Sequence, residues 1–124
     1  MNGQMPSIEQ ILAGMKEKLG GADPVPMQLL AQLLPEGVRE QARSSQFVES
    51  LPAIPLKYKT LMYVAAAAAA GSELCTKTYA QRALKAGATV EEVTEALLVA
   101  RFVSASIVLA TAVPTMEFLV EQRA

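Results

Sequence analysis

The segment SELCTKTYAQRALKA, residues 72–86, decides the interpretation of this chain, and Gly87-Ala88-Thr89 follows it directly. Gly71 ends the preceding alanine run, and Ser72 is a good helix N-cap because its hydroxyl accepts from amides of the first turn. The segment therefore predicts a helix whose first turn holds Cys75, the one cysteine of the chain. Unpaired amides and the positive end of the helix dipole favour the thiolate form of a cysteine in that place.

Four polar side chains share one face of this expected helix. At about 100° per residue, all of them fall within roughly 80° of one another. They are Ser72, Cys75, Tyr79 and Arg82. A face with a thiol, two hydroxyls and a cation is a candidate reactive site. We predict Cys75, Tyr79 and Ser72 as catalytic residues and Arg82 as a substrate-binding residue. The structural alternatives are a small buried hydrophobe at Cys75, a core phenol at Tyr79 and a simple N-cap at Ser72.

Length and composition limit the classes of protein to consider. The 124 residues fit a single domain, in which we expect amino-terminal helices over 1–54 and a core over 55–120. The net charge of −1 gives no general attraction to nucleic acid or to an anionic membrane. Apolar residues reach 52% while aromatic residues make up 5%, which favours closely approaching helices over a sheet sandwich. The expected fold is all-α, with six or seven helices.

The expected helices can be placed from caps and breakers. The first helix runs from the capping box Ser7–Gln10 to Gly20-Gly21. The following helices cover 27–34, 35–48, 57–70, 73–86 and 90–103, and a last helix reaches Val120. We expect a break near Ser104 and a kink at Pro114. The six alanines at 65–70 offer little side-chain area and would let neighbouring helices approach closely.

The stretch from Ala96 to Pro114 is apolar enough to suggest a membrane span, but Arg101 lies inside it. A central arginine is costly in a bilayer, so we predict a buried helix pair in a soluble oligomer and no membrane contact. Arg101 would then form an ion pair with a carboxylate such as Glu73 or Glu95, or bind substrate. Residues 1–7 lack a secretory signal pattern, and one cysteine agrees with a reducing compartment, so we expect a cytoplasmic location.

Several segments resemble the carboxymuconolactone decarboxylase family, which includes the alkylhydroperoxidase D-like proteins. The resemblance spans about residues 55–112 and rests on Leu56-Lys-Tyr-Lys-Thr60, the alanine-rich helix, Ser72-Glu-Leu-Cys75 and Ala83-Leu-Lys-Ala-Gly87-Ala-Thr89-Val-Glu91-Glu92. The last of these is its most specific part. The resemblance implies a helical subunit that forms a homotrimer or homohexamer. In peroxidase members, a Cys-x-x-Cys-x-x-x-His segment starts the helix and an upstream glutamate serves a proton relay.

Transferred by position, the second cysteine of that motif is Cys75, while the first falls on Ser72 and the histidine on Tyr79. The chain contains no histidine, and residues 55–71 contain no acidic residue. Three of the four parts are therefore replaced. Tyr79 could still donate a hydrogen bond to the thiolate or to a departing oxygen, with Arg82 orienting the phenol.

The sequence therefore predicts thiol-dependent reduction of a small peroxide through Cys75, with an external thiol as reductant. Two alternatives stay open: a non-catalytic binding or scaffold protein, and a decarboxylase or isomerase in which Arg82 or Arg101 holds a carboxylate. No cofactor and no metal is expected, because one cysteine without histidine cannot form a tetrahedral zinc site within a subunit. No basic-aromatic pattern for nucleic acid is present either.

Overall fold

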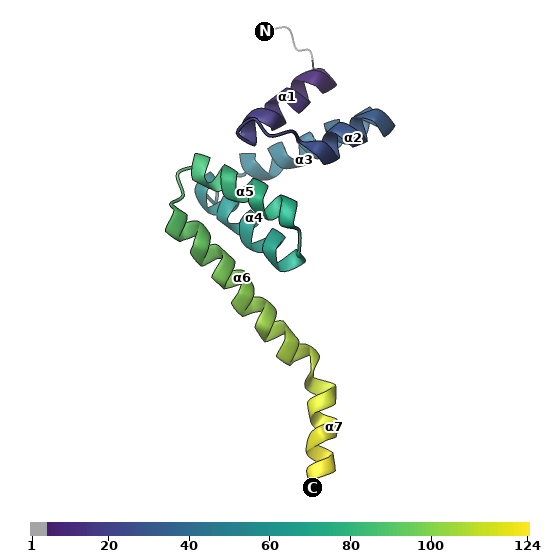
Figure 1. Ribbon diagram of the computed structural model, residues 1–124, viewed down its shortest axis with the longest axis vertical. Helices are drawn as coiled ribbons and strands as arrows, with labels where there is room; N and C mark the ends of the chain where they lie inside the picture. Colours follow the sequence, from purple (N-terminus) through teal and green to yellow (C-terminus); the bar gives the residue numbers. More distant parts are fainter. Residues whose placement is uncertain (1–4) are drawn as a thin grey trace. The chain divides into compact units, whose positions relative to one another are not determined.

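The computed structural model describes residues 5–124, and its regular structure there is helical, without strands (Figure 1). Residues 1–4, which begin the segment inspected for a secretory signal, lie outside the described residues. This described part contains seven helices: α1 (Ile8–Lys18), α2 (Val25–Leu33), α3 (Pro35–Ser50), α4 (Leu56–Ala70), α5 (Glu73–Lys85), α6 (Val90–Thr111) and α7 (Val113–Arg123). The predicted all-α fold is confirmed.

Contacts within the chain divide it into two compact units, the first ending at Lys59 and the second covering Thr60–Ala124. The boundary falls inside α4, a few residues after the predicted change from amino-terminal helices to core. The prediction of a single domain stays a prediction. Each unit is described by itself below.

In the first unit, helices start where the sequence supplies a cap or a proline. Ser7 and Gln10 form the predicted capping box, with the Gln10 amide donating to Ser7 Oγ at 3.1 Å and the Ser7 amide donating to Gln10 Oε1 at 2.8 Å. The second helix begins two residues before its predicted start. Pro26 lies in the first turn of this helix, where a missing N–H costs nothing, so the proline begins the helix instead of preceding it.

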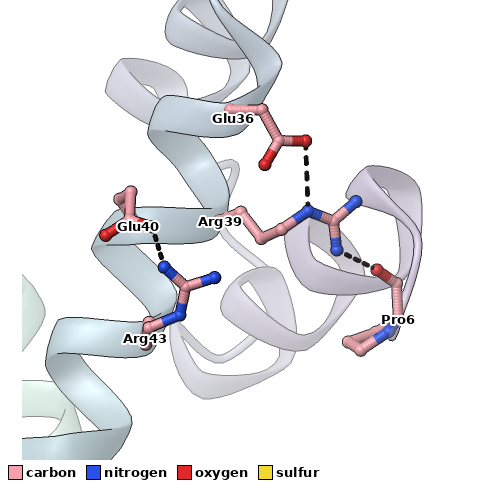
Figure 2. Close-up of polar contacts among 5 residues, drawn as sticks. All are labelled: Pro6, Glu36, Arg39, Glu40 and Arg43. Atoms are coloured by element: carbon pink, nitrogen blue, oxygen red, sulfur yellow. Dashed lines mark hydrogen bonds and ion pairs between the residues drawn. The ribbon is translucent and has the colours of Figure 1, made fainter. Parts of the chain in front are cut away.

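Arg39 links the start of α1 to α3, as Figure 2 shows. Its Nη1 donates to the carbonyl oxygen of Pro6 at 2.6 Å, and its Nε lies 3.3 Å from Glu36 Oε1. One turn further along α3, Arg43 pairs with Glu40. The link formed by Arg39 crosses 33 positions of sequence, so it fixes tertiary structure and not only the helix that carries it.

Lys59 is buried, with 7% of the residue exposed. Its ammonium group donates to the carbonyl oxygens of Val48 at 2.6 Å and Leu51 at 2.5 Å. These carbonyls belong to the last turn of α3 and its C-cap, where helix carbonyls lack intrahelical partners and a positive charge is favoured. Lys59 therefore closes the end of α3 from outside that helix.

The core of the second unit is small and rich in alanine. Val64 and Ala83 are fully buried and Ala88 nearly so, and side chains of α4, α5 and α6 pack against this cluster: Leu61, Tyr79, Ala80, Val93 and Ala96. Within the alanine run Ala67 is buried, whereas Ala66, Ala69 and Ala70 are exposed. The run therefore faces the core along one side.

Two glycines end α4 and α5 in the same way. Gly71 and Gly87 adopt φ values of +83° and +99°, the left-handed region that glycine enters without strain. The amide of the residue after each glycine donates to the carbonyl oxygen five residues earlier, Ser72 to Ala67 at 3.1 Å and Ala88 to Ala83 at 2.9 Å. Both ends are Schellman motifs. Gly71 thus sets the direction in which α5 starts.

Substituting Gly71 with alanine is expected to lower the free energy of unfolding by about 1–2 kcal/mol, because a Cβ atom disfavours this backbone conformation. Gly14 provides the matched control. It lies inside α1 with no atom within 4 Å of an added Cβ, so Gly14→Ala should raise that free energy by about 0.5–1 kcal/mol. Urea unfolding at fixed protein concentration measures both, and a neutral Gly71→Ala variant would contradict this reading of the turn.

The predicted break near Ser104 is wrong, because α6 runs unbroken from Val90 to Thr111. Serine hydroxyls can bond back to their own helix, as Ser106 Oγ does to the Phe102 carbonyl at 3.1 Å, so these residues do not end it. The helix ends at Ala112. Pro114 lies in the first turn of α7, and not inside a kinked helix, because its ring would clash with the carbonyl of a continuing helix.

Much of α6 and all of α7 expose apolar side chains. Among the described residues, α6 is the one helix long and apolar enough to cross a membrane by length and composition, and 11% of its most apolar stretch is buried within the chain. Fourteen large apolar side chains of α6 and α7 are each exposed by more than a third: Val90, Leu97, Leu98, Val99, Phe102, Val103, Ile107, Val108, Leu109, Val113, Met116, Phe118, Leu119 and Val120. We call this set the carboxyl-terminal surface.

Candidate functional site

The candidate site begins at the amino-terminal end of α5. Ser72 has an extended backbone, with φ −93° and ψ 102°, and its Oγ accepts from the Cys75 amide at 3.2 Å. The Ser72 carbonyl in turn accepts from the Thr76 amide at 3.0 Å and the Thr76 hydroxyl at 2.6 Å. The predicted N-cap is confirmed, and it fixes the first turn of the helix.

Cys75 is the third residue of α5, and its side chain is half-buried. Its own amide is engaged by Ser72, which leaves the amides of Glu73 and Leu74 as the first-turn donors. The sulfur therefore lies within one turn of the positive end of the helix dipole, and it is neither enclosed in the core nor fully exposed. This is the kind of setting in which cysteine thiols are reactive.

Tyr79, one turn after Cys75, is half-buried and packs on Tyr63 of α4. The ring centroids are 5.0 Å apart and the planes are tilted by 55°. Arg82 lies over the Tyr63 ring, with its Cζ 5.7 Å from the centroid. The guanidinium thus lies against Tyr63, and the predicted role of Arg82 in orienting the Tyr79 phenol stays a prediction. The Tyr63 ring therefore contacts both Tyr79 and Arg82.

Tyr63 is the member of this face that sequence reasoning missed. The sequence positions of the two tyrosines could have indicated this contact, because Tyr63 lies eight residues before Gly71 and Tyr79 lies eight residues after it. A chain that reverses direction at this glycine brings equidistant positions together on its two helices. The pairing therefore follows once the turn is identified, and the cation over the first ring completes a Tyr–Tyr–Arg cluster.

The opposite face of α5 borders an open groove of about 500 Å³. Glu73 and Lys77, one turn apart, line it on α5 together with Ala80, and Val64 and Leu97 of the neighbouring helices also line it. The remaining lining residues are Ala68, Gly71, Ser72, Thr76 and Val93. Cys75, Tyr79 and Arg82 are absent from this lining, so the groove and the thiol lie on different faces of one helix.

Arg101 does not join the other predicted residues. It lies on α6 with its side chain exposed, and no ion pair connects it to Glu73 or Glu95 within the described chain. The structure therefore brings together Ser72, Cys75, Tyr79 and Arg82 along α5 and adds Tyr63, while Arg101 stands apart.

The face of α5 that carries Cys75, Tyr79 and Arg82 offers few reactive groups. They are one sulfur nucleophile, the Ser72 hydroxyl that caps the helix, the phenols of Tyr63 and Tyr79, and one guanidinium over the Tyr63 ring. The sequence contains no histidine that could act as a general base. Such a set suits attack by sulfur on an electrophile whose leaving group needs a single proton.

Comparison with known proteins identifies the group to which the chain belongs. None of the curated proteins matches it. The profile of the Carboxymuconolactone decarboxylase family matches residues 41–117, well over half of the chain. The match extends beyond the resemblance over residues 55–112 at both ends, and it includes α4, α5, α6 and the cysteine. The chain therefore belongs to the carboxymuconolactone decarboxylase family, and its seven described helices have the fold of that family.

Proposed function

We propose that this protein reduces peroxides with an external thiol, using Cys75 as the nucleophile. The observation that carries the proposal is the place of Cys75: a half-buried thiol in the first turn of a capped helix, one turn from a phenol. Thiolates at helix amino-termini are the species that attack peroxides. Family membership supports the helical setting of Cys75 but does not establish the reaction. Of the four parts of the motif found in peroxidase members, the chain retains only the second cysteine.

In the first step, the Cys75 sulfur attacks one oxygen of the peroxide. An S–O bond forms, the O–O bond breaks, and sulfur loses two electrons to become a sulfenic acid. The other oxygen leaves as an alcohol, or as water when hydrogen peroxide is the substrate. The proton that the thiol gave up returns to this leaving oxygen, and we assign to the Tyr79 hydroxyl, one turn after Cys75, the hydrogen bond that assists its departure.

The second step needs a thiol that the chain does not contain, since Cys75 is its one cysteine. An external thiol attacks the sulfenic sulfur, water leaves, and a mixed disulfide forms. A second thiol then releases Cys75 and carries away the disulfide. Two thiols are oxidised for each peroxide reduced, which balances the electrons of the cycle.

Ser72, Tyr79 and Arg82 have different parts in this proposal. Ser72 holds the first turn in which the sulfur lies. Tyr79 donates to the leaving oxygen. Arg82 is a positioning residue that acts on Tyr79 through the Tyr63 ring. Arg101, exposed on another helix, takes no part in the step.

Tyr79→Phe is expected to slow the oxidation of Cys75 by hydrogen peroxide about tenfold, which corresponds to the loss of one hydrogen bond in the transition state. The phenylalanine keeps the ring contact with Tyr63, so the fold should not change. Tyr58→Phe is the control, because Tyr58 is exposed on α4 and its ring contact with Lys57 survives the change. Equal rates for both variants would remove Tyr79 from the mechanism.

The proposal is tested by following thiol oxidation with dithiothreitol as reductant and hydrogen peroxide or cumene hydroperoxide as oxidant. We expect peroxide-dependent turnover above the rate of dithiothreitol alone, proportional to protein concentration. In parallel, release of carbon dioxide from a small lactone carboxylic acid tests the decarboxylase alternative. Carbon dioxide release without peroxide turnover would overturn the peroxidase proposal.

The groove favours a second candidate function, ligand binding without chemistry. Its volume of about 500 Å³ lies within the range of small-molecule sites, and its lining omits Cys75. A largely apolar wall beside Glu73 and Lys77 suits a small amphipathic molecule. A fluorescent apolar probe, 8-anilinonaphthalene-1-sulfonate, tests this: Lys77→Glu should weaken its binding, whereas Cys75→Ser should not. Loss of binding in Cys75→Ser alone would argue against this candidate.

A further inference from the structure

The charged side chains of α5 are distributed unequally around the helix. At about 100° per residue, Arg82 falls within about 20° of Cys75 and Lys85 within about 80° of it. Glu73, the one carboxylate of α5, falls about 160° away and lines the groove on the opposite face together with Lys77. The side of α5 that carries the thiol therefore has two cations and no carboxylate of its own.

The neighbouring helices of the same unit do not cancel this positive charge near the thiol. Residues 60–70, the part of α4 in this unit, contain no charged side chain. Three carboxylates lie in the first two turns of α6, which follow the carboxyl-terminal end of α5 and not the end that carries Cys75: Glu91, Glu92 and Glu95. An anion that approaches Cys75 along α5 is therefore attracted and not repelled.

Arg82 is held against the aromatic pair on the thiol face. It is half-buried, and its Cζ lies 5.7 Å from the centre of the Tyr63 ring, which lies 5.0 Å from the centre of the Tyr79 ring. Long side chains on a helix point back toward its amino terminus, which is the end that carries Cys75. Along the helix axis, Cys75 and Arg82 are about 10 Å apart. A guanidinium in this place suits a carboxylate, which accepts from its N–H groups in pairs.

We propose that the external thiol that reduces oxidised Cys75 carries a carboxylate, and that Arg82 binds this carboxylate during the attack. The inference rests on the proposed peroxidase activity and adds the chemical class of its reductant. The span between sulfur and guanidinium fits a short peptide thiol, because three extended residues cover about 10 Å. Neither Cys75 nor Arg82 belongs to the carboxyl-terminal surface, so the proposal does not depend on what covers that surface.

The reductant, and not the peroxide, is the reactant for which a cation is useful. Hydrogen peroxide is neutral and needs only the sulfur and one proton donor, whereas a thiol attacks as the thiolate, which is an anion. When the thiolate attacks the Cys75 sulfenic acid, an S–S bond forms and the S–O bond breaks. The oxygen leaves as water with the proton that the thiol lost on ionisation. A second thiolate then attacks the sulfur of the first, and Cys75 leaves as a thiolate.

The test uses the full chain, oxidised at Cys75 with one equivalent of hydrogen peroxide. The loss of sulfenic acid is followed after mixing with glutathione or with its glycyl ethyl ester, which differs from glutathione by one neutralised carboxylate. At low salt, we expect wild-type protein to react about fivefold faster with glutathione, the effect of an ion pair of about 1 kcal/mol. In Arg82→Gln, the two rates should agree within about twofold. Arg123→Gln, exposed in the last turn of α7, is the matched control and should keep the wild-type ratio.

Salt tests the same contact without a substitution, in case Arg82→Gln alters the fold. Raising the ionic strength from about 0.01 M to about 1 M shortens the Debye length from about 30 Å to about 3 Å, so the wild-type ratio should fall to near one. A wild-type protein that forms no sulfenic acid would overturn the peroxidase proposal and this one with it. A sulfenic acid that reacts equally with both thiols at low salt would overturn the reductant assignment alone, as would an unchanged ratio in folded Arg82→Gln.

Discussion

Peroxide turnover is expected to fall by about 100-fold or more when Cys75 is replaced by serine. The hydroxyl of serine is far less ionised than a thiol near neutral pH and does not form a stable oxidised product with peroxide. The sequence holds no other sulfur nucleophile that could substitute, since Cys75 is its one cysteine. The measurement is the initial rate of peroxide-dependent oxidation of dithiothreitol, compared at equal concentrations of wild type and variant.

A matched control for this variant is Thr78→Ser, which introduces a serine three residues later on the same helix, at a half-buried position. We expect the control to keep the wild-type rate within about twofold, since Thr78 is not in the proposed mechanism. A Cys75→Ser protein that still consumes peroxide at the wild-type rate would show that the activity comes from elsewhere, and the proposed role of the cysteine would be rejected.

The second large effect concerns stability. Lys59→Met is expected to lower the free energy of unfolding by about 2–3 kcal/mol, because hydrogen bonds from a charged donor contribute about 1.5–3 kcal/mol and the carbonyls left behind are partly buried. Methionine retains an unbranched apolar side chain, so the change removes mainly the two bonds to Val48 and Leu51. Urea unfolding monitored by circular dichroism gives the value.

Lys77→Met is the control for this prediction, because Lys77 is exposed on α5 and the change of side chain is the same. Its effect should stay within about 0.5 kcal/mol, as for most surface substitutions. If both variants unfold at the same urea concentration, the bonds at the end of α3 do not contribute as described, and Lys59 is merely buried.

The helices could be predicted to within a few residues because their ends are determined locally. The Ser7 capping box, the Ser72 N-cap and the Schellman glycine Gly87 each act through residues next to them in sequence. The failed prediction at Ser104 shows the limit of such rules. Serine has only a weak preference against helix, and the neighbouring apolar residues continue the helix until Pro114 prevents a carbonyl from being bonded.

The site could be predicted only where it belongs to one helix. The sequence predicts one helix that carries Cys75, Tyr79 and Arg82 at a helical spacing and begins at Ser72. The structure has the three residues on α5 and Ser72 as its N-cap. The partner of Arg82 could not be predicted from this spacing, because Tyr63 comes from the preceding helix and depends on the turn at Gly71. The same applies to Lys59, whose acceptors lie eight and eleven residues away.

The predicted burial of α6 differs from the contacts of Arg82 and Lys59, because contacts within one chain do not supply it. The sequence predicts a buried helix in an oligomer, and within one chain most of this helix is exposed. Periodicity and composition report that a helix needs cover, but they do not say which molecule supplies it. That prediction therefore stands or falls with the measured mass of the protein and not with the contacts of one chain.

The most direct test of the central claim is trapping of the oxidised sulfur. Wild-type protein is treated with one equivalent of hydrogen peroxide in the presence of dimedone, which captures sulfenic acids, and the adduct is located by peptide mass spectrometry. The account predicts a dimedone adduct on Cys75 in most of the chains, with a matching loss of peroxide. A thiol that remains unmodified after the peroxide has been in contact with the folded protein would contradict it.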